Sequence, residues 1–275
     1  MVLASITPTP AHPGPDQEAG TMGKKGTPLG IDIGGSGIKG APVDLKRGEL
    51  AGERLRIDTP KPATPDAVAA VVDEIVDYFA DVTDDSPIGV TVPAVVIRGT
   101  VLSAANIDPA WVNTDAEALI KEHTGRSVTV LNDADAAGLA ELYYGAAKGV
   151  QGLVILTTLG TGIGSAIIHE GRLVPNSELG HLEMDGHDAE DIAASSRKDI
   201  ENLSWEEYIE RLQRYYSMLE RLFSPDLIIV GGGISKDSDD FLPHLRLRAP
   251  IVPAQLRNQA GIIGAAHLAV DLAKK

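Results

Sequence analysis

The stretch Leu29–Asp44 reads LGIDIGGSGIKGAPVD and contains three glycines spaced as G-x-G-x-x-G directly after an apolar run. In dinucleotide-binding proteins this spacing opens a helix whose N-terminus faces a pyrophosphate. Here Gly40 and Pro42 fall inside the first turns of any such helix, and both residue types disfavour a helix interior. We therefore predict a strand, a glycine-rich turn and a second strand.

A glycine-rich hairpin can also bind phosphate, because backbone N–H groups can crowd an anion where no Cβ obstructs them. Asp32 precedes the turn, so the stretch favours a metal-bound phosphate, with a purely structural hairpin as the alternative. The stretch 153–171 repeats the pattern, with Gly160, Gly162 and Gly164 between two apolar runs. Two similar hairpins indicate two similar lobes.

The composition is that of an acidic globular protein. Its 275 residues include 39 acidic and 24 basic side chains, with a formal net charge of −15. This charge argues against broad binding to nucleic acids or anionic membranes, and no apolar run approaches the ~20 residues that span a bilayer. The absence of cysteine excludes disulfides and thiolate metal ligands. We expect a cytoplasmic protein that binds neither nucleic acid nor membranes.

Apolar spacing and capping residues predict the elements between these hairpins. An amphipathic helix is expected over 65–81, and buried strands over 88–96 and 128–131. Thr114 and Glu117 match a capping box that would begin another helix.

The same patterns divide the chain into regions. Residues 1–27 are rich in Pro, Gly, Thr and Ala, which predicts a disordered leader. We assign 28–132, together with a C-terminal helix at about 261–275, to an N-terminal lobe. We assign 133–260 to a C-terminal lobe.

Five motifs follow one another along the chain: D-x-G-G-S at 32–36, N-D at 132–133, L-G-T-G-I-G at 159–164, E-x-G-H at 178–181 and V-G-G-G at 230–233. Their order resembles the ROK family of sugar kinases. That resemblance implies the two-lobed α/β fold of actin, hexokinase and ribonuclease H, with the active site in the interlobe cleft. The sequence is most similar to the branch of bacterial kinases that use polyphosphate on glucose or mannose.

The resemblance implies a role for each motif. It assigns phosphate binding to Asp32, Gly34, Gly35, Ser36, Gly160, Thr161 and Gly162. It assigns the nucleoside side of the donor to Gly231, Gly232 and Gly233. It assigns sugar binding to Asn132, Asp133, Glu178, His181 and Glu190. Asp133 would be the catalytic carboxylate that faces the attacking hydroxyl, and Asp32 would help to organise Mg²⁺, directly or indirectly.

Some of these residues also allow other interpretations. Asp133 could serve only to cap a helix, and Ser36 could serve only to form a turn. Asp135 is the rival for the catalytic carboxylate. Glu183 competes with Glu190 for the later sugar-binding position.

One segment departs from the family pattern. Many ROK proteins continue after E-x-G-H with a cysteine-rich zinc segment, whereas residues 184–199 read MDGHDAEDIAASSRKD. We therefore expect no zinc, since His181 and His187 are too few for a tetrahedral site. The leader is also unsuited to a helix-turn-helix module, which disfavours the repressor branch.

The resemblance implies an enzyme that phosphorylates glucose, or mannose, at the 6-hydroxyl. Polyphosphate or ATP would be the donor, Mg²⁺ the cofactor, and the protein a homodimer. The alternatives are a strictly ATP-dependent glucokinase or mannokinase and a non-catalytic sugar-binding regulator; retention of both Asp32 and Asp133 argues against the regulator. Polyphosphate would need a local basic track on this acidic surface. Its candidates are Lys39, Lys148, Arg197 and Lys198.

Overall fold

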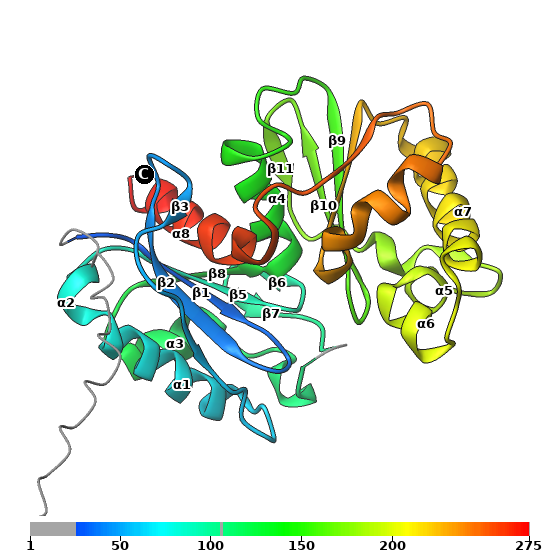
Figure 1. Ribbon diagram of the computed structural model, residues 1–275. Coiled ribbons are helices and arrows are strands. Elements are labelled where there is room, and N and C mark those ends of the chain that lie inside the picture. The colour runs from blue at the N-terminus through cyan, green and yellow to red at the C-terminus, as the bar shows by residue number, and fades with distance from the viewer. Residues whose placement is uncertain (1–25, 105–106, 275) are drawn as a thin grey trace, which may run out of the picture.

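The computed structural model describes residues 26–104 and 107–274 (Figure 1). The predicted disordered leader therefore lies almost wholly outside the described residues and stays a prediction. Its last two residues are described, and the backbone N–H groups of Gly26 and Thr27 donate to the carbonyl of Val82 at 2.9 and 3.2 Å.

The first sheet contains the opening hairpin. Its strand order is β3-β2-β1-β5-β8, with β4 paired to β2. β1 and β2 are antiparallel, whereas β5 and β8 run parallel to β1, so the strand, turn and strand predicted for 29–44 are confirmed. The strand predicted over 88–96 ends early, at Val92, because Pro93 cannot donate to a ladder. The bounds are β1 Leu29–Ile33, β2 Ile38–Asp44, β3 Glu49–Leu50, β4 Leu55–Ile57, β5 Ile88–Val92 and β8 Val128–Asn132.

The helices α1 and α3 pack against this sheet and share its apolar core. The helix predicted over 65–81 is interrupted at Phe79, whose side chain is buried in that core. The capping box predicted at Thr114 is wrong: Asp115 caps the next helix, and Glu117 instead accepts the backbone N–H of Val130 at 3.0 Å. The bounds are α1 Pro65–Tyr78, α2 Ala80–Thr83, α3 Ala116–Thr124, η1 Pro109–Trp111, and the small hairpin β6 Val96–Ile97 with β7 Thr100–Val101.

The second sheet repeats the plan of the first. Its order is β11-β10-β9-β14-β15; β9 and β10 are antiparallel, whereas β14 and β15 run parallel to β9. The hairpin predicted for 153–171 is therefore confirmed. Helix α7 buries a row of apolar and tyrosine side chains beside this sheet and begins at the capping box of Ser204 and Glu207. The bounds are β9 Leu153–Leu159, β10 Ile163–His169, β11 Arg172–Val174, β14 Leu227–Gly231, β15 Ile251–Pro253 and α7 Trp205–Phe223.

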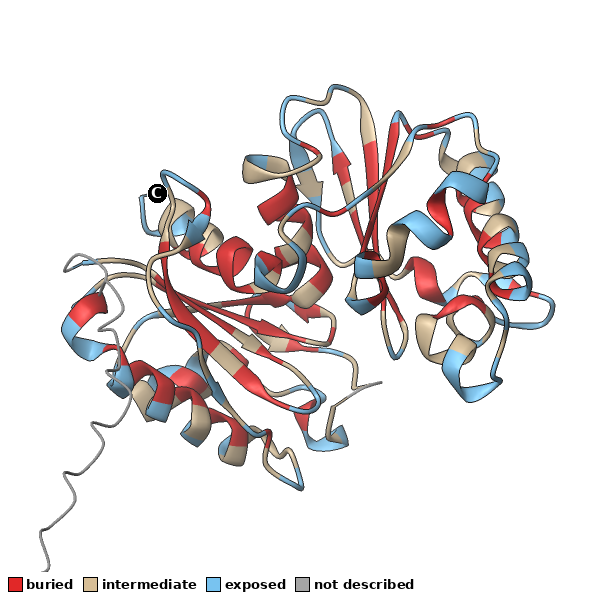
Figure 2. Ribbon diagram, in the orientation of Figure 1, coloured by how far each residue is buried: buried red, intermediate tan, exposed pale blue. Residues whose placement is uncertain are grey.

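Two helices, α4 (Asp133–Tyr144) and α8 (Ala260–Ala273), lie between the sheets (Figure 1). α8 packs on β1 and β5, and a Cβ at Gly30 would clash with the backbone of Ile262. α8 also crosses α4 so closely that a Cβ at Gly264 would clash with the backbone of Ala136. Buried residues therefore run continuously from sheet to sheet through these helices (Figure 2). The predicted lobe limits stay a prediction.

The remaining elements are short, and most of them lie between the strands of the second sheet in the sequence. They are η2 Leu179–His181, β12 Glu183–Met184, β13 His187–Asp188, α5 Glu190–Ala193, α6 Ser195–Ile200, η3 Gly233–Asp240, η4 Leu242–His244 and η5 Arg257–Gln259. Within the described ranges, no helix has the length and apolar content needed to cross a membrane.

Candidate active site

A cavity of about 560 Å³ lies where the turns of the two hairpins face each other. It brings together most of the predicted site residues: Asp32, Gly34, Gly35, Asn132, Asp133, Gly160, Thr161, Gly162, Glu178, His181, Glu190 and Gly232. In the cavity that the described residues form, Ser36, Gly231 and Gly233 are not part of the lining. Ser36 is exposed, and its carbonyl accepts a hydrogen bond from Arg56 at 2.8 Å.

The first glycine turn follows β1, and hydrogen bonds from neighbouring residues fix its position. Asp32 accepts a hydrogen bond from Thr91 Oγ1 at 2.9 Å, and Lys39 Nζ lies 3.6 Å from its other oxygen. The carbonyl of Gly34 accepts from Thr59 Oγ1 at 2.5 Å. A Cβ at Gly35 would meet no described atom within 4 Å, so the turn leaves room for a ligand to approach the backbone.

The second glycine turn, 160–162, is braced by residues of the segment 184–199. Ser196 donates its backbone N–H to Gly160 and its hydroxyl to Thr161, at 3.0 and 2.8 Å. Glu190 accepts the backbone N–H of Ile163 at 2.9 Å while it lines the cavity. The side chain of its rival, Glu183, accepts the N–H of Gly186 at 2.7 Å within its own turn.

The alternative that Asp133 merely caps helix α4 is not what the structure shows. Asn132 is the cap, because its Oδ1 accepts the N–H groups of Ala134 and Asp135 at 2.8 and 3.0 Å. Its Nδ2 donates to the carbonyl of Ala94 at 3.1 Å, which leaves one amide hydrogen for a ligand. Asp133 is thereby placed as the first residue of α4, in the wall of the cavity.

The two carboxylates of α4 have different surroundings. Burial, with Asp32 and then Glu178 as negative neighbours, raises the pKa of Asp133 to about 6. Asp135 is 2% exposed, and its Oδ2 accepts the N–H of Asn176 at 2.8 Å. Burial, with Glu178 and Asp133 as weaker contributions, raises the pKa of Asp135 to about 7. Of these two carboxylates, Asp133 lines the cavity.

Asn176 also ties the second sheet's loop to the small β6–β7 hairpin of the first lobe. Its Oδ1 accepts the N–H of Val96, and its Nδ2 donates to the carbonyl of Val96, both at 2.9 Å. The edge of the cavity next to Glu178 is therefore held from both lobes.

Two of the predicted sugar-binding residues, Glu178 and His181, have a neighbour, Asp188, that none of the motifs indicated. His181 Nδ1 lies 2.8 Å from Asp188, and His181 Nε2 lies 3.9 Å from Glu178. The hydrogen bond to Asp188 is the main cause that raises the pKa of His181, and burial raises the pKa of Glu178. The Asp-Gly pair at 185–186, a common hairpin turn, is the sequence signal that would have brought Asp188 back beside His181.

One carboxylate of the cavity, that of Asp32, could help to bind a magnesium ion that is shared with the substrate. Within the part of the chain that the structure describes, no group of three or more His, Cys, Asp or Glu residues could hold a metal ion. Mg²⁺ commonly takes only one or two carboxylates together with substrate phosphates and water. Asp32, beside the first glycine turn, fits that limited role.

The predicted basic track is only partly available. Lys39 faces Asp32, Lys198 lies 4.5 Å from the centre of the Trp205 ring, and Arg197 pairs with Asp191 at 3.1 Å. Lys148 is exposed. The track stays a prediction.

Comparisons with known proteins find sugar kinases that are similar to this chain over most of its length. The polyphosphate glucokinase of Mycobacterium tuberculosis (strain CDC 1551 / Oshkosh) is 51% identical over 243 residues, which are 88% of this chain and 91% of that protein. The crystal structure of an inorganic polyphosphate/ATP-glucomannokinase from Arthrobacter sp. strain KM is 57% identical, with a TM-score of 0.86 over 90% of this chain and 100% of that one.

A ROK family glucokinase from Streptomyces griseus, in complex with glucose and AMPPNP, is 26% identical with a TM-score of 0.77, over 90% of this chain and 100% of that one. These structural matches confirm the predicted α/β fold of the actin and hexokinase type. Residues 28–198 match the ROK family. The chain belongs to the ROK family.

Proposed function

We infer that the protein is a kinase that transfers a phosphoryl group from inorganic polyphosphate to glucose. Its similarity to the polyphosphate glucokinase and to the polyphosphate/ATP-glucomannokinase extends over most of each chain. The observation that carries the inference is the cavity itself, which places two glycine turns and the carboxylate of Asp133 around one space. An enzyme is therefore favoured over a non-catalytic regulator.

Asp133 acts as the base in this proposal. The sugar hydroxyl oxygen attacks the terminal phosphorus, the bond from that phosphorus to the bridging oxygen of the donor breaks, and the hydroxyl proton passes to Asp133. A pKa of about 6 suits this task, because the carboxylate is ionised at neutral pH and is more basic than an ordinary aspartate. We propose the 6-hydroxyl of the hexose as the nucleophile.

The other residues position the two substrates. Asn132, Glu178 and His181 bind the remaining sugar hydroxyls, which both donate and accept hydrogen bonds. Asp188 fixes the ring of His181 through its hydrogen bond. The N–H groups of the two glycine turns bind the donor phosphates from either lobe. Mg²⁺, bound by the donor phosphates with help from Asp32, would neutralise the charge that develops on the transferred group.

ATP as a second donor and mannose as a second acceptor are part of the proposal. They are supported by the description of the Arthrobacter protein as a polyphosphate/ATP-glucomannokinase and by the Streptomyces griseus kinase that holds AMPPNP. A strictly ATP-dependent glucokinase is the remaining alternative. A homodimer in the cytoplasm stays a prediction.

The test is the initial rate of glucose 6-phosphate formation with polyphosphate and with ATP on one preparation. We expect turnover with both donors and with mannose as a second acceptor. Turnover with ATP and none with polyphosphate would leave the strictly ATP-dependent alternative standing.

A further inference from the structure

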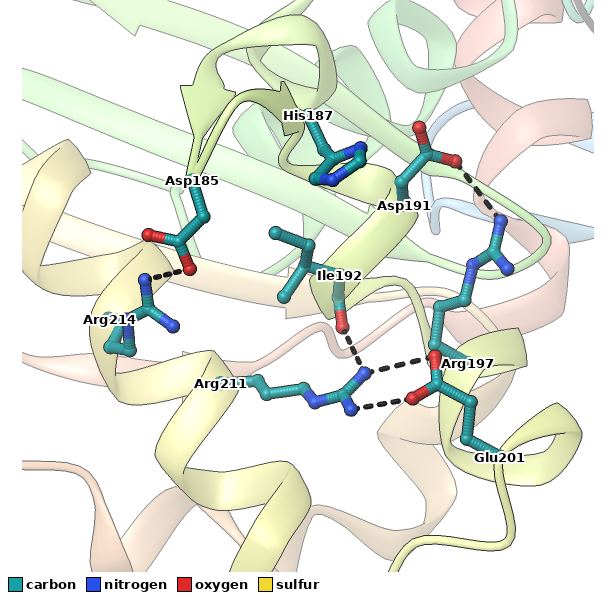
Figure 3. Close-up of a pocket in the computed structure, with 8 residues that line it drawn as sticks. All are labelled: Asp185, His187, Asp191, Ile192, Arg197, Glu201, Arg211 and Arg214. Atoms are coloured by element: carbon teal, nitrogen blue, oxygen red, sulfur yellow. Dashed lines mark hydrogen bonds and ion pairs between the residues drawn. The ribbon is translucent and has the colours of Figure 1, made fainter.

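A second cavity, of about 520 Å³, is lined by residues of α5, α6, α7 and the β12–β13 hairpin (Figure 3). Three arginines converge on it: Arg197 from α6, and Arg211 and Arg214 from α7. His187 from β13 and the acidic residues Asp185, Asp191 and Glu201 complete its polar lining. We call this cavity the arginine groove.

The arginines are held to different degrees. Arg211 makes a bidentate pair with Glu201, at 2.6 and 3.1 Å, and also donates to the carbonyl of Ile192, so its role is structural. Arg214 makes a single short contact with Asp185, and the side chains of both are more than half exposed. An exposed pair of this kind contributes little stability, because water and salt screen it. A phosphate oxygen can therefore replace Asp185 on Arg214.

Arg197 is also only partly engaged. Its guanidinium pairs with Asp191 at 3.1 Å through one terminal nitrogen, and its side chain is 34% exposed. Its Nε is enclosed by protein and has no hydrogen-bond partner within residues 26–104 and 107–274, so the terminal nitrogens are the donors that a ligand in the groove can reach.

One segment separates the arginine groove from the active site. Arg197 directly follows Ser196, which hydrogen-bonds to Gly160 and Thr161 of the second glycine turn. Asp191 in the groove directly follows Glu190, which lines the active-site cavity. The two cavities share no lining residue, so a linear ligand that occupies both has to pass around this segment.

We propose that the arginine groove binds inner phosphates of the polyphosphate chain whose terminal phosphate lies in the active site. The proposal rests on the proposed use of polyphosphate. This donor carries about one negative charge per phosphate along a chain that has to extend beyond the site of transfer. Guanidinium groups match such phosphates, because their forked N–H groups donate two parallel hydrogen bonds.

The test uses two substitutions with opposite expected effects. Arg214→Gln removes a phosphate ligand and should raise the KM for long polyphosphate roughly 3- to 10-fold, the size expected for one exposed charged contact. Asp185→Asn removes the carboxylate that competes for Arg214 and should lower the same KM. Both effects should shrink with short polyphosphate chains, which cannot reach the groove. Arg221→Gln, an exposed position on the same helix outside the groove, is the control for lost charge and should leave the KM at the wild-type value.

The outcomes separate this inference from the proposed function. Opposite shifts in KM that grow with chain length support the groove, since damage to the fold would not improve one variant. A wild-type enzyme that uses polyphosphate, with KM unchanged or raised in both groove variants, would overturn the groove alone. A wild-type enzyme that turns over ATP but not polyphosphate would overturn both the proposed donor and the groove.

Discussion

Replacing Asp133 with asparagine should remove most of the turnover and leave glucose binding nearly intact. The amide keeps the size of the side chain and an oxygen that can accept the N–H of Ala134, as Oδ1 does at 2.8 Å. It cannot accept the proton of the sugar hydroxyl. General-base catalysis contributes ~10²–10⁴-fold, so we expect kcat to fall by that factor.

The pH dependence of kcat/KM in the wild type is a second test of Asp133 as the base. The pKa of Asp133, raised to about 6 by burial and by Asp32 and Glu178, means that the base is ionised above that pH and protonated below it. Hence kcat/KM should be level near neutral pH and should fall ~10-fold for each unit of pH below 6. An ordinary aspartate would hold its activity to about pH 4.

The matched control is Asp135→Asn, the same substitution two residues along α4. Asp135 is buried outside the lining of the active-site cavity, so this variant should keep most of its kcat. Glucose 6-phosphate formation, followed with a coupled dehydrogenase, gives kcat, and calorimetric titration gives glucose affinity. Near wild-type turnover in Asp133→Asn, with Asp135→Asn inactive, would refute the assignment and move the base to Asp135.

Four further predictions concern stability, donor, metal and leader. Burial raises the pKa of Asp135 to about 7 in the folded protein, whereas an aspartate of the unfolded chain loses its proton near about pH 4. The free energy of unfolding should therefore fall as the pH rises from about 4 to about 7. The contribution of Asp135 should reach up to about 4 kcal/mol in urea unfolding, and Asp135→Asn should keep only the smaller fall that comes from Asp133; parallel curves would contradict this. Turnover with polyphosphate should decline more steeply with added salt than turnover with ATP, and equal slopes would argue against a basic track. Chelation should stop turnover until Mg²⁺ is restored, without unfolding the protein; stoichiometric zinc in elemental analysis, lost together with the fold, would contradict a zinc-independent enzyme. Deletion of residues 1–25 should leave turnover unchanged, and a large loss would show that this segment is part of the fold.

The parts of the fold that depend on local patterns could be predicted from the sequence. Both hairpins follow from glycines between apolar runs, and α1 follows from the apolar spacing over 65–81. The predicted start of α3 was wrong. Glu117 has the correct spacing for a capping box with Thr114, but its carboxylate accepts a hydrogen bond from Val130 on a neighbouring strand instead. Such competition between local and tertiary partners cannot be read from spacing alone.

The candidate site divides in the same way. Its motifs are contiguous, so residues such as Asp133 and Glu178 could be proposed before their positions were known. Asp188 was missed because its partner lies across a two-strand hairpin. The arginine groove was missed apart from Arg197, because Arg211 and Arg214 join it only when α7 packs beside α5.

The hydrogen bonds between Asn176 and Val96 restrain the cleft at the edge next to Glu178. Rotation of the lobes that opens the cleft at this edge breaks both bonds, each worth ~1 kcal/mol, whereas opening at the opposite edge breaks neither. We therefore expect the glycine turns to separate and approach while Glu178 and Asp133 keep their spacing. On this basis we expect the hexose to meet a preformed site and the donor end of the cleft to adapt to what it binds.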